Sequence, residues 1–387
     1  MRVWHLIDAC GPQATCTTLA LLGQSLSRLG DVDQEVLLLG GAALRKRAED
    51  AGVRSARTMG VPFGRGAAGF FAVQRLARRL GPFDLVHCWS PGTMALAAAA
   101  LRRVPRLLTL SFAPTSAQVR WMRAVMAAVA GSPTVLLPTS ATIRRLLLSR
   151  GLPEQAVHVL RPGLDMGRVA HGRRDQLREQ WGLTRPQLTV VALLSDQPQA
   201  ANAMDAAMAT ALADPDPQAS GPGACLLVHP DARHERRARR IMAEVGRRDS
   251  YVADARLERP WLVLPGCDAA LVQTDGGLSL LWAMASNVPI VGEATYAVSE
   301  IVEDRHSALL AKPGAPKYLA HRLTQLMEDR QLAWQLRDTA RHEAYSFFSR
   351  QRYCQSLAAV YEQMAAGREV EVPALESTGG LRFAGRG

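Results

Sequence analysis

Two glycines follow an aspartate directly before a predicted apolar helix. Residues 274–277 read TDGG, and a helix is expected over residues 278–286. Glycine lets the backbone pass close to a ligand, and the first amide groups of a helix have no partner within it. Such amides can contact an anion, although an aspartate among them opposes a phosphate electrostatically. The candidates for contact with a polar ligand are therefore Thr274, Asp275, Gly276 and Gly277.

Three further candidates lie at or just after the ends of predicted strands. His87 is in the strand 84–88, Ser111 follows the strand 106–110, and Gly11 follows the first strand. His87 has two interpretations: it faces a ligand, or it is a core histidine with its hydrogen bonds satisfied. The six cysteines are scattered without a C-x-x-C pair or a His-Cys cluster, so no metal site and no redox centre is predicted.

Short apolar strands alternate with helical segments along most of the chain. Near-continuous apolar strands separated by helices of 10 to 15 residues predict parallel sheets covered on both faces. The predicted strands are 3–7, 35–39, 84–88, 106–110, 134–137, 157–160, 188–194, 225–229, 269–272 and 288–291. The predicted fold class is α/β, with two Rossmann-like, doubly wound domains.

A polar connection over residues 161–184 separates two similar sets of strands and helices. We expect a first domain over 1–165 and a second over 166–345, facing each other across a cleft that is a natural ligand site. A helix over 346–366 is expected to return to the first domain. Residues 367–387 are rich in glycine and polar residues and are expected to form a flexible tail.

Composition excludes several classes of protein. With 387 residues, 48% of them hydrophobic, the chain can bury two cores, which excludes global disorder. The longest apolar run, residues 94–101, is much shorter than the ~20 residues of a membrane-spanning helix. The N-terminus reads as a buried strand rather than an export signal, so we expect a cytoplasmic protein.

The chain has 46 Lys and Arg residues against 35 Asp and Glu, a net charge of +11 that favours anionic partners. Segments 44–47, 76–80 and 119–123 combine arginine with apolar residues. They suggest peripheral contact with an anionic membrane at its inner face, although helices packed on a sheet give the same pattern. Residues 234–240 are interpreted as a solvated basic helix face. No recognition helix or basic-aromatic groove is found, so no nucleic-acid partner is expected.

Several segments resemble those of family 4 glycosyltransferases, also called glycosyl transferases group 1, which have the GT-B architecture. The clearest is WAMASNVPIVG at 282–292, followed by SEIVED at 299–304 and ALLAKPG at 308–314. Upstream, VLRPGLD at 159–165, LREQWGL at 177–183, HLIDACGP at 5–12 and DLVH at 84–87 are similar to family segments. These matches follow the family order from Met1 to about Met364.

The resemblance implies transfer of a sugar from a nucleotide-sugar donor to an unknown acceptor, with retention of configuration and without a metal or other cofactor. It places Glu300 and residues 274–277 on the donor side, and Gly11, His87 and Ser111 on the acceptor side. Glu300 could instead cap a helix that we expect it to open. The chain departs from the family at several polar positions. Leu193 and Gln199 stand where an Arg and a Lys are expected, Thr274 and Trp282 replace two glutamates, and Gln13-Ala14 replaces a glycine pair.

Two hypotheses follow from this pattern. The first is a transferase of the hexosyltransferase type. The second is a catalytically degenerate GT-B scaffold or binding protein without turnover, because Trp282 cannot chelate a ribose diol and the two cations are absent. The segment Ala283-Met284-Ala285 is better evidence for the fold than for the activity. Its small residues allow a helix to pack tightly on a sheet whether or not a ligand binds.

Overall fold

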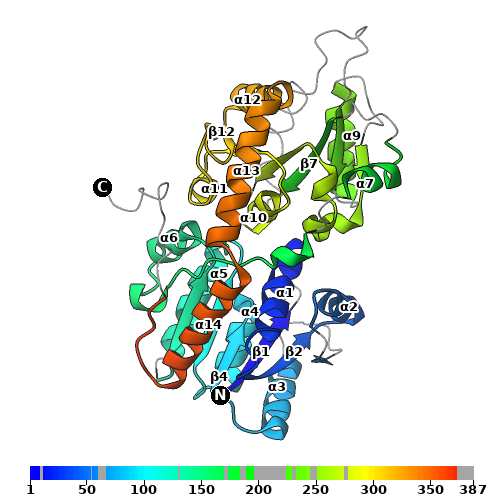
Figure 1. Ribbon diagram of the computed structural model, residues 1–387. Coiled ribbons are helices and arrows are strands. Elements are labelled where there is room, and N and C mark those ends of the chain that lie inside the picture. Colours follow the sequence, from blue (N-terminus) through cyan, green and yellow to red (C-terminus); the bar gives the residue numbers. More distant parts are fainter. Residues whose placement is uncertain are drawn as a thin grey trace. The chain divides into compact units, whose positions relative to one another are not determined.

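The computed structural model describes residues 1–8, 12–53, 55–59, 67–129, 131–169, 173–183, 189–195, 224–228, 232–244, 251–273 and 278–372. These residues form two compact units. Unit 1 contains Met1–Gly163 and the segment that begins at Arg350, and unit 2 contains Leu164–Ser349. Figure 1 shows the elements of both.

Unit 1 alternates strands and helices along the chain. Its elements are β1 Arg2–Asp8, α1 Pro12–Leu26, β2 Asp33–Leu39, α2 Ala42–Asp50, β3 Ala56–Met59, α3 Ala67–Leu80, β4 Leu85–Cys88, α4 Pro91–Ala100, β5 Arg106–Leu110, α5 Ser116–Ala128, β6 Thr134–Pro138, α6 Ala141–Ser149, the 3₁₀ turn Glu154–Ala156, and α14 Arg350–Ala365.

The described strands of unit 1 form one parallel sheet in the order β3-β2-β1-β4-β5-β6. The strands are apolar on both faces because helices cover both. One core contains residues of α3, α4, α5 and α6, and the other contains residues of α1, α2 and α14. In Figure 1, α14 accompanies the elements of unit 1 although it follows unit 2 in the sequence.

Short polar side chains fix where several unit 1 helices begin. The Ser90 and Thr93 side chains form a capping box at the start of α4, in which the Ser90 hydroxyl accepts a hydrogen bond of 3.0 Å from the Thr93 amide. Thr115 and Gln118 form the same motif at α5, and Ser140 caps α6. Each motif satisfies amides that lack partners within the helix and so sets the point at which the chain leaves the sheet edge.

Unit 2 has a second set of strands and helices. Its elements are a 3₁₀ turn Met166–Arg168, α7 Arg174–Gln180, β7 Thr189–Ser195, β8 Ala224–Val228, α9 Ala232–Glu244, β9 Tyr251–Ala253, 3₁₀ turns Ala255–Glu258, Pro260–Leu262 and Leu264–Gly266, β10 Ala269–Gln273, α10 Leu278–Ala285, β11 Ile290–Glu293, α11 Tyr296–Ser299, β12 Leu309–Ala311, α12 Pro316–Glu328 and α13 Arg330–Phe347.

The described strands of unit 2 form a parallel sheet in the order β12-β11-β10-β7-β8-β9. One core brings α10 and α13 onto the sheet, and the other contains residues of α9, α12 and α13. The strand order changes direction between β10 and β7, as it does between β1 and β4 in unit 1. Both sheets are thus doubly wound, and the predicted α/β class with two Rossmann-like domains is confirmed.

The strands differ from the prediction in two ways. The structure adds three strands that were not predicted, β3, β9 and β12. Conversely, residues 157–160 are not a strand: this segment forms only an isolated bridge between Val157 and Leu136. Val157 and Leu160 are buried because the segment leaves the sheet beside β6, which gives a strand-like pattern without a ladder.

Candidate functional site

In open α/β sheets, ligands bind outside the carboxyl ends of the strands, where the strand order reverses. In unit 1 this point lies between β1 and β4. β1 ends at Asp8, and β4 is followed by Ser90 and the first turn of α4. A Cβ atom on Gly92 would lie 2.9 Å from Asp8 Oδ2, so the glycine allows the carboxylate to approach this turn. The positive end of the helix stabilises the carboxylate there.

This arrangement favours a ligand hydroxyl over a phosphate. A carboxylate already occupies the helix terminus where an anion would otherwise bind, so a phosphate would be repelled. A ligand hydroxyl, by contrast, can donate a hydrogen bond to a carboxylate. Asp8 is not among the residues predicted from the sequence. The signal that could have found it is an acid at the carboxyl end of the first strand.

His87 lies in β4 and is completely buried. Its Nδ1 is 2.7 Å from the Tyr361 hydroxyl of α14, and its Nε2 is 2.8 Å from the Thr109 hydroxyl of β5. The ring also stacks on Trp89, with centroids 4.2 Å apart. Both ring nitrogens are therefore engaged inside unit 1. The geometry matches the core interpretation of His87, and contact with an acceptor stays a prediction.

A second buried histidine, His5, pairs with His87 across β1 and β4. Gln34 donates from its amide nitrogen to the Leu29 carbonyl, which leaves its oxygen to accept from His5 Nε2 at 3.1 Å. Trp89 Nε1 can only donate, so His5 Nδ1 accepts at 3.2 Å. Both contacts suit a neutral ring.

Burial lowers the pKa of His5 to about 4, although the Gln34 bond opposes the shift. Burial, together with the neighbouring His5, also lowers the pKa of His87 well below its ordinary value. Both rings are therefore uncharged at neutral pH, which makes this pair a structural element of the unit 1 core.

Ser111 and Gly11 are the two remaining acceptor-side candidates. Ser111 follows β5 and is buried, and its hydroxyl is 3.4 Å from that of Thr18 in α1. Gly11 lies outside the described residues. Of the predicted acceptor-side residues, the structure thus places His87 and Ser111 in one unit, at neighbouring strands β4 and β5.

In unit 2 the strand order reverses between β10 and β7, whose last residues, Gln273 and Ser195, are paired in register. The donor candidates Thr274, Asp275, Gly276 and Gly277 come next in the sequence and lie outside the described residues. The next strand, β11, ends at Glu293, whose carboxylate accepts a hydrogen bond of 3.0 Å from the Gly314 amide. This bond connects the two segments that follow β11 and β12.

Glu300 lies at the end of α11, not at its start. Thr295 caps this short helix by accepting from the Val298 amide, and the Glu300 amide donates to the Tyr296 carbonyl at 3.1 Å. The expectation that Glu300 opens a helix is therefore wrong, and an N-terminal capping role is ruled out. Its side chain is half-buried. Glu300 follows α11, which itself follows the carboxyl end of β11.

Trp282, which the sequence resemblance aligns with a glutamate, belongs to the core of unit 2. It is 2% exposed, and its ring lies 4.5 Å from that of Trp261. Among the described residues its Nε1 has no hydrogen-bond partner. An indole offers a single N–H donor and no acceptor, so this side chain cannot reproduce the contacts of a carboxylate.

The sequence resemblance aligns two uncharged residues, Leu193 and Gln199, with cations. Leu193 is a buried core residue of β7, and Gln199 lies outside the described residues. The buried Arg178 of unit 2 binds Asp268, which also pairs with Arg174. Because Asp268 directly precedes β10, this cluster lies at the amino edge of the sheet, opposite the expected ligand edge.

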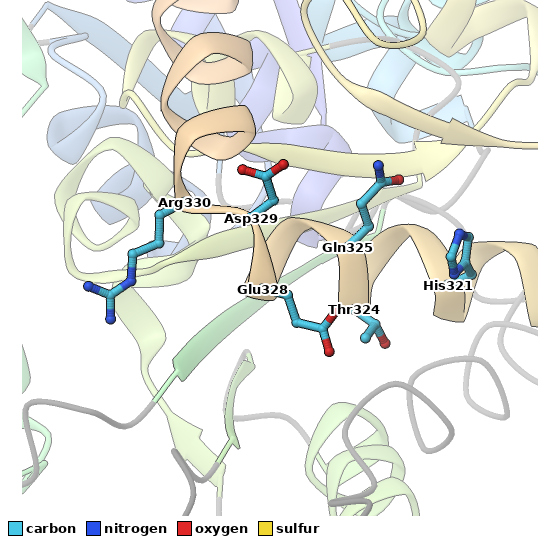
Figure 2. A pocket seen from close by; sticks show the side chains of 6 residues that line it. All are labelled: His321, Thr324, Gln325, Glu328, Asp329 and Arg330. Atoms are coloured by element: carbon cyan, nitrogen blue, oxygen red, sulfur yellow. The ribbon is translucent and has the colours of Figure 1, made fainter.

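A surface hollow of about 430 Å³ lies at the junction of α12 and α13. Figure 2 shows the side chains that line it: His321, Thr324, Gln325, Glu328, Asp329 and Arg330. Asp329 caps α13 by accepting from the Leu332 amide at 2.9 Å. The described site candidates, His87, Ser111 and Glu300, are not among the residues that line the hollow.

The described ranges contain no cluster of three or more His, Cys, Asp or Glu side chains placed to hold a metal ion. No helix within them is both long enough and apolar enough to cross a bilayer.

Two family models match the chain, one in each unit. Residues 17–168 match Glycosyltransferase Family 4, and residues 262–343 match Glycosyl transferases group 1. Together the two models cover more than half of the chain, in the order that the resemblance predicted. The chain belongs to the family 4, group 1 glycosyltransferases.

Solved structures share the fold over nearly the whole chain. HepE from Anabaena in complex with UDP-glucose has a TM-score of 0.76 at 17% identity, with 95% of this chain and 100% of that chain covered. A glycosyltransferase from Rickettsia africae has a TM-score of 0.71 at 13% identity, covering 94% and 98%. Sucrose-phosphate synthase from Thermosynechococcus elongatus has a TM-score of 0.70 at 14% identity, covering 95% and 100%. Among curated proteins, none matches the sequence significantly.

Proposed function

We propose that this protein transfers a sugar from a nucleotide-sugar donor to a hydroxyl-bearing acceptor. The observation that carries the proposal is the presence of two doubly wound units that match the two family models in the family order. The likeness to HepE, solved with UDP-glucose and with UDP and glucose, supports a donor of the nucleotide-sugar type.

Unit 2 is proposed to bind the donor. Its candidates follow strands at the carboxyl edge of the sheet: residues 274–277 follow β10, and Glu300 follows α11, which succeeds β11. The leaving diphosphate gains negative charge, and helix amides and nearby cations lower the barrier by stabilising that charge. Retention of the sugar's configuration and independence from metal are part of the proposal.

Unit 1 is proposed to hold the acceptor. The Asp8 carboxylate at its strand switch point disfavours a phosphate and can accept a hydrogen bond from a hydroxyl. Ser111 directly follows β5 at the carboxyl edge of the same sheet, and Gly11 is proposed to contact the acceptor from its position in the sequence after β1. The Asp8 carboxylate thus supports a neutral, hydroxyl-bearing acceptor in unit 1.

The second candidate function is a binding protein without turnover, and the state of Trp282 favours it. Trp282 is buried and packed on Trp261, and Leu193 is buried in β7. The sequence resemblance aligns the first with a carboxylate and the second with a cation. Both changes remove polar contacts to a donor and leave the core intact.

Ligand-induced stabilisation separates the two functions. The full chain is heated with UDP, GDP, ADP and the corresponding sugar nucleotides, and release of nucleotide is followed in parallel. A ligand at 100 times its Kd adds about 2.7 kcal/mol, which raises the Tm of a unit of this size by roughly 5 °C or more. Stabilisation with turnover supports the transferase, and stabilisation without turnover supports the binding protein. No response to any nucleotide contradicts both.

Glu300→Gln and Asp275→Ala are the variants that test the proposed donor contacts. If Glu300 accepts a hydrogen bond from the donor, its neutral amide should weaken binding about tenfold, since a hydrogen bond to a charged group contributes about 1.5–3 kcal/mol. Asp275→Ala should abolish binding. Calorimetric titration measures both. Glu328→Gln, at an exposed glutamate at the end of α12, is the matched control. Unchanged affinity in both test variants would mean that the site is misplaced.

A further inference from the structure

One face of unit 1 carries positive charge almost without acidic residues. Between residues 67 and 150 the only acid is Asp84, whose carboxylate accepts a bond of 2.7 Å from the Arg2 amide. The same segment contains these arginines: Arg75, Arg78, Arg79, Arg102, Arg103, Arg106, Arg120, Arg123, Arg144, Arg145 and Arg150. It therefore accounts for most of the net charge of the chain.

Most of these arginines project into solvent. Arg106 is buried and Arg144 pairs with Glu154, but seven others have exposed side chains and no acidic partner among the described residues. They are Arg75, Arg78 and Arg79 of α3, Arg102 and Arg103 after α4, and Arg120 and Arg123 of α5. We call these seven residues, with Phe71 and Trp121, the arginine face.

The fold places the arginine face on one side of the sheet. α4 contacts both α3 and α5, and all three contribute to one core through residues such as Val73, Met94 and Val119. Because these residues point toward the sheet, the exposed residues of the same helices point away from it. Along α3, Phe71, Arg75 and Arg78 recur at helical spacing on that outer side.

Large apolar groups are exposed among the guanidinium groups. Phe71 in α3 is 63% exposed and Trp121, beside Arg120, is 42% exposed. Between these helices, α4 (Pro91–Ala100) has no charged residue, and its Ala99 is exposed. The face thus combines an uncharged central helix with aromatic rings and arginines on both sides.

We propose that the arginine face binds the surface of a bilayer that contains anionic lipids. Guanidinium groups pair with lipid phosphates, while tryptophan and phenylalanine rings enter the boundary between headgroups and acyl chains. A nucleic acid would match the charge but would leave the uncharged α4 facing a polyanion. The combination of charge and apolar area therefore favours lipid.

Vesicle binding with matched variants tests the charge. The full chain is sedimented with vesicles of phosphatidylcholine alone or with about 30 mol% phosphatidylglycerol, at low and at physiological salt. We expect binding to the anionic vesicles only, and this binding should weaken as the salt concentration increases.

Arg78→Gln/Arg79→Gln/Arg120→Gln should weaken binding to the anionic vesicles about a hundredfold, because each basic residue near the surface contributes about fivefold. Arg236→Gln/Arg240→Gln/Arg330→Gln, with the same loss of charge in unit 2, should bind like the natural chain.

Tryptophan quenching tests the orientation. Lipids with brominated acyl chains quench indole rings that enter the bilayer, and Trp121→Phe should remove that quenching. Trp334→Phe, at the 55% exposed tryptophan of α13, should leave it unchanged. Circular dichroism verifies that each variant is folded.

Three outcomes would overturn the proposal. They are equal binding to both kinds of vesicle, equal losses in the two triple variants, and quenching that survives Trp121→Phe. Preferential binding of duplex DNA through the same arginines, without binding to vesicles, would identify the face as a nucleic-acid surface instead.

Discussion

The buried histidines of unit 1 illustrate how the surroundings of a single residue set its protonation state. His5 donates to Gln34 and accepts from Trp89, and His87 lies between Tyr361 and Thr109. The two side chains are neutral because burial penalises the charged form. A protonated His5 would turn both nitrogens into donors and would leave the Trp89 N–H without an acceptor.

This arrangement predicts a loss of stability in mild acid. In the unfolded chain His5 binds a proton below about pH 6.5, whereas in the folded chain it binds one only below about pH 4. Lowering the pH through this window therefore favours unfolding, and His5 alone removes about 3 kcal/mol. Urea denaturation of the full chain between pH 4 and 7 measures the slope.

His5→Gln should make that slope shallower, whatever its effect at neutral pH, because glutamine does not titrate. His321→Gln, at an exposed histidine of α12, controls for the loss of one histidine. An unchanged slope in His5→Gln would show that His5 is not the neutral buried group that the geometry indicates.

Secondary-structure elements show why edges are harder to predict than centres. The unpredicted strands β3, β9 and β12 all lie at sheet edges and have only three or four residues. β3 and β9 contain no fully buried residue, so they lack the apolar runs that mark central strands. Only pairing with a neighbour defines them.

The ends of unit 2's strands also depend on contacts between distant residues. The Asp268 carboxylate accepts from the Val190 amide at 2.7 Å and binds Arg174 and the buried Arg178, whose Nε donates to the Gly266 carbonyl. One side chain thereby joins α7, the start of β7 and the turn before β10.

Asp268→Asn should lower the free energy of unfolding by about 3 kcal/mol, because it leaves the Arg178 charge buried without its counter-ion. Chemical denaturation measures the loss. Glu49→Gln removes the exposed ion pair with Arg45 and should cost less than about 0.5 kcal/mol. Equal losses in the two variants would mean that Arg178 is solvated.

At the level of the complete chain, unit 1 is built from two segments that are distant in sequence. α14 follows unit 2 but packs into unit 1, where Tyr353, Leu357, Val360 and Tyr361 are fully buried. Burying a large apolar side chain contributes about 1.5–3 kcal/mol, so these four together match the net stability of an ordinary domain.

A chain that ends after Ser349 should therefore lose unit 1 as a folded unit while unit 2 keeps its own cores. Hydrogen exchange should show β1 and β4 unprotected and β7 and β10 protected. A chain that ends after residue 372 keeps α14 and is the control. Protection of β1 without α14 would contradict the prediction.

The sequence alone predicted the α/β class, the two doubly wound units and the family, because central parallel strands are buried on both faces and carry that burial as apolar runs. The sequence also showed which polar residues come directly after the predicted strands. Only the tertiary structure decided that both ring nitrogens of His87 contact hydroxyl groups, those of Tyr361 and Thr109. It also decided that Glu300 ends a helix, and that the Asp8 carboxylate lies close to Gly92 in the first turn of α4. These properties arise from residues up to 274 positions apart, and no local pattern records such contacts.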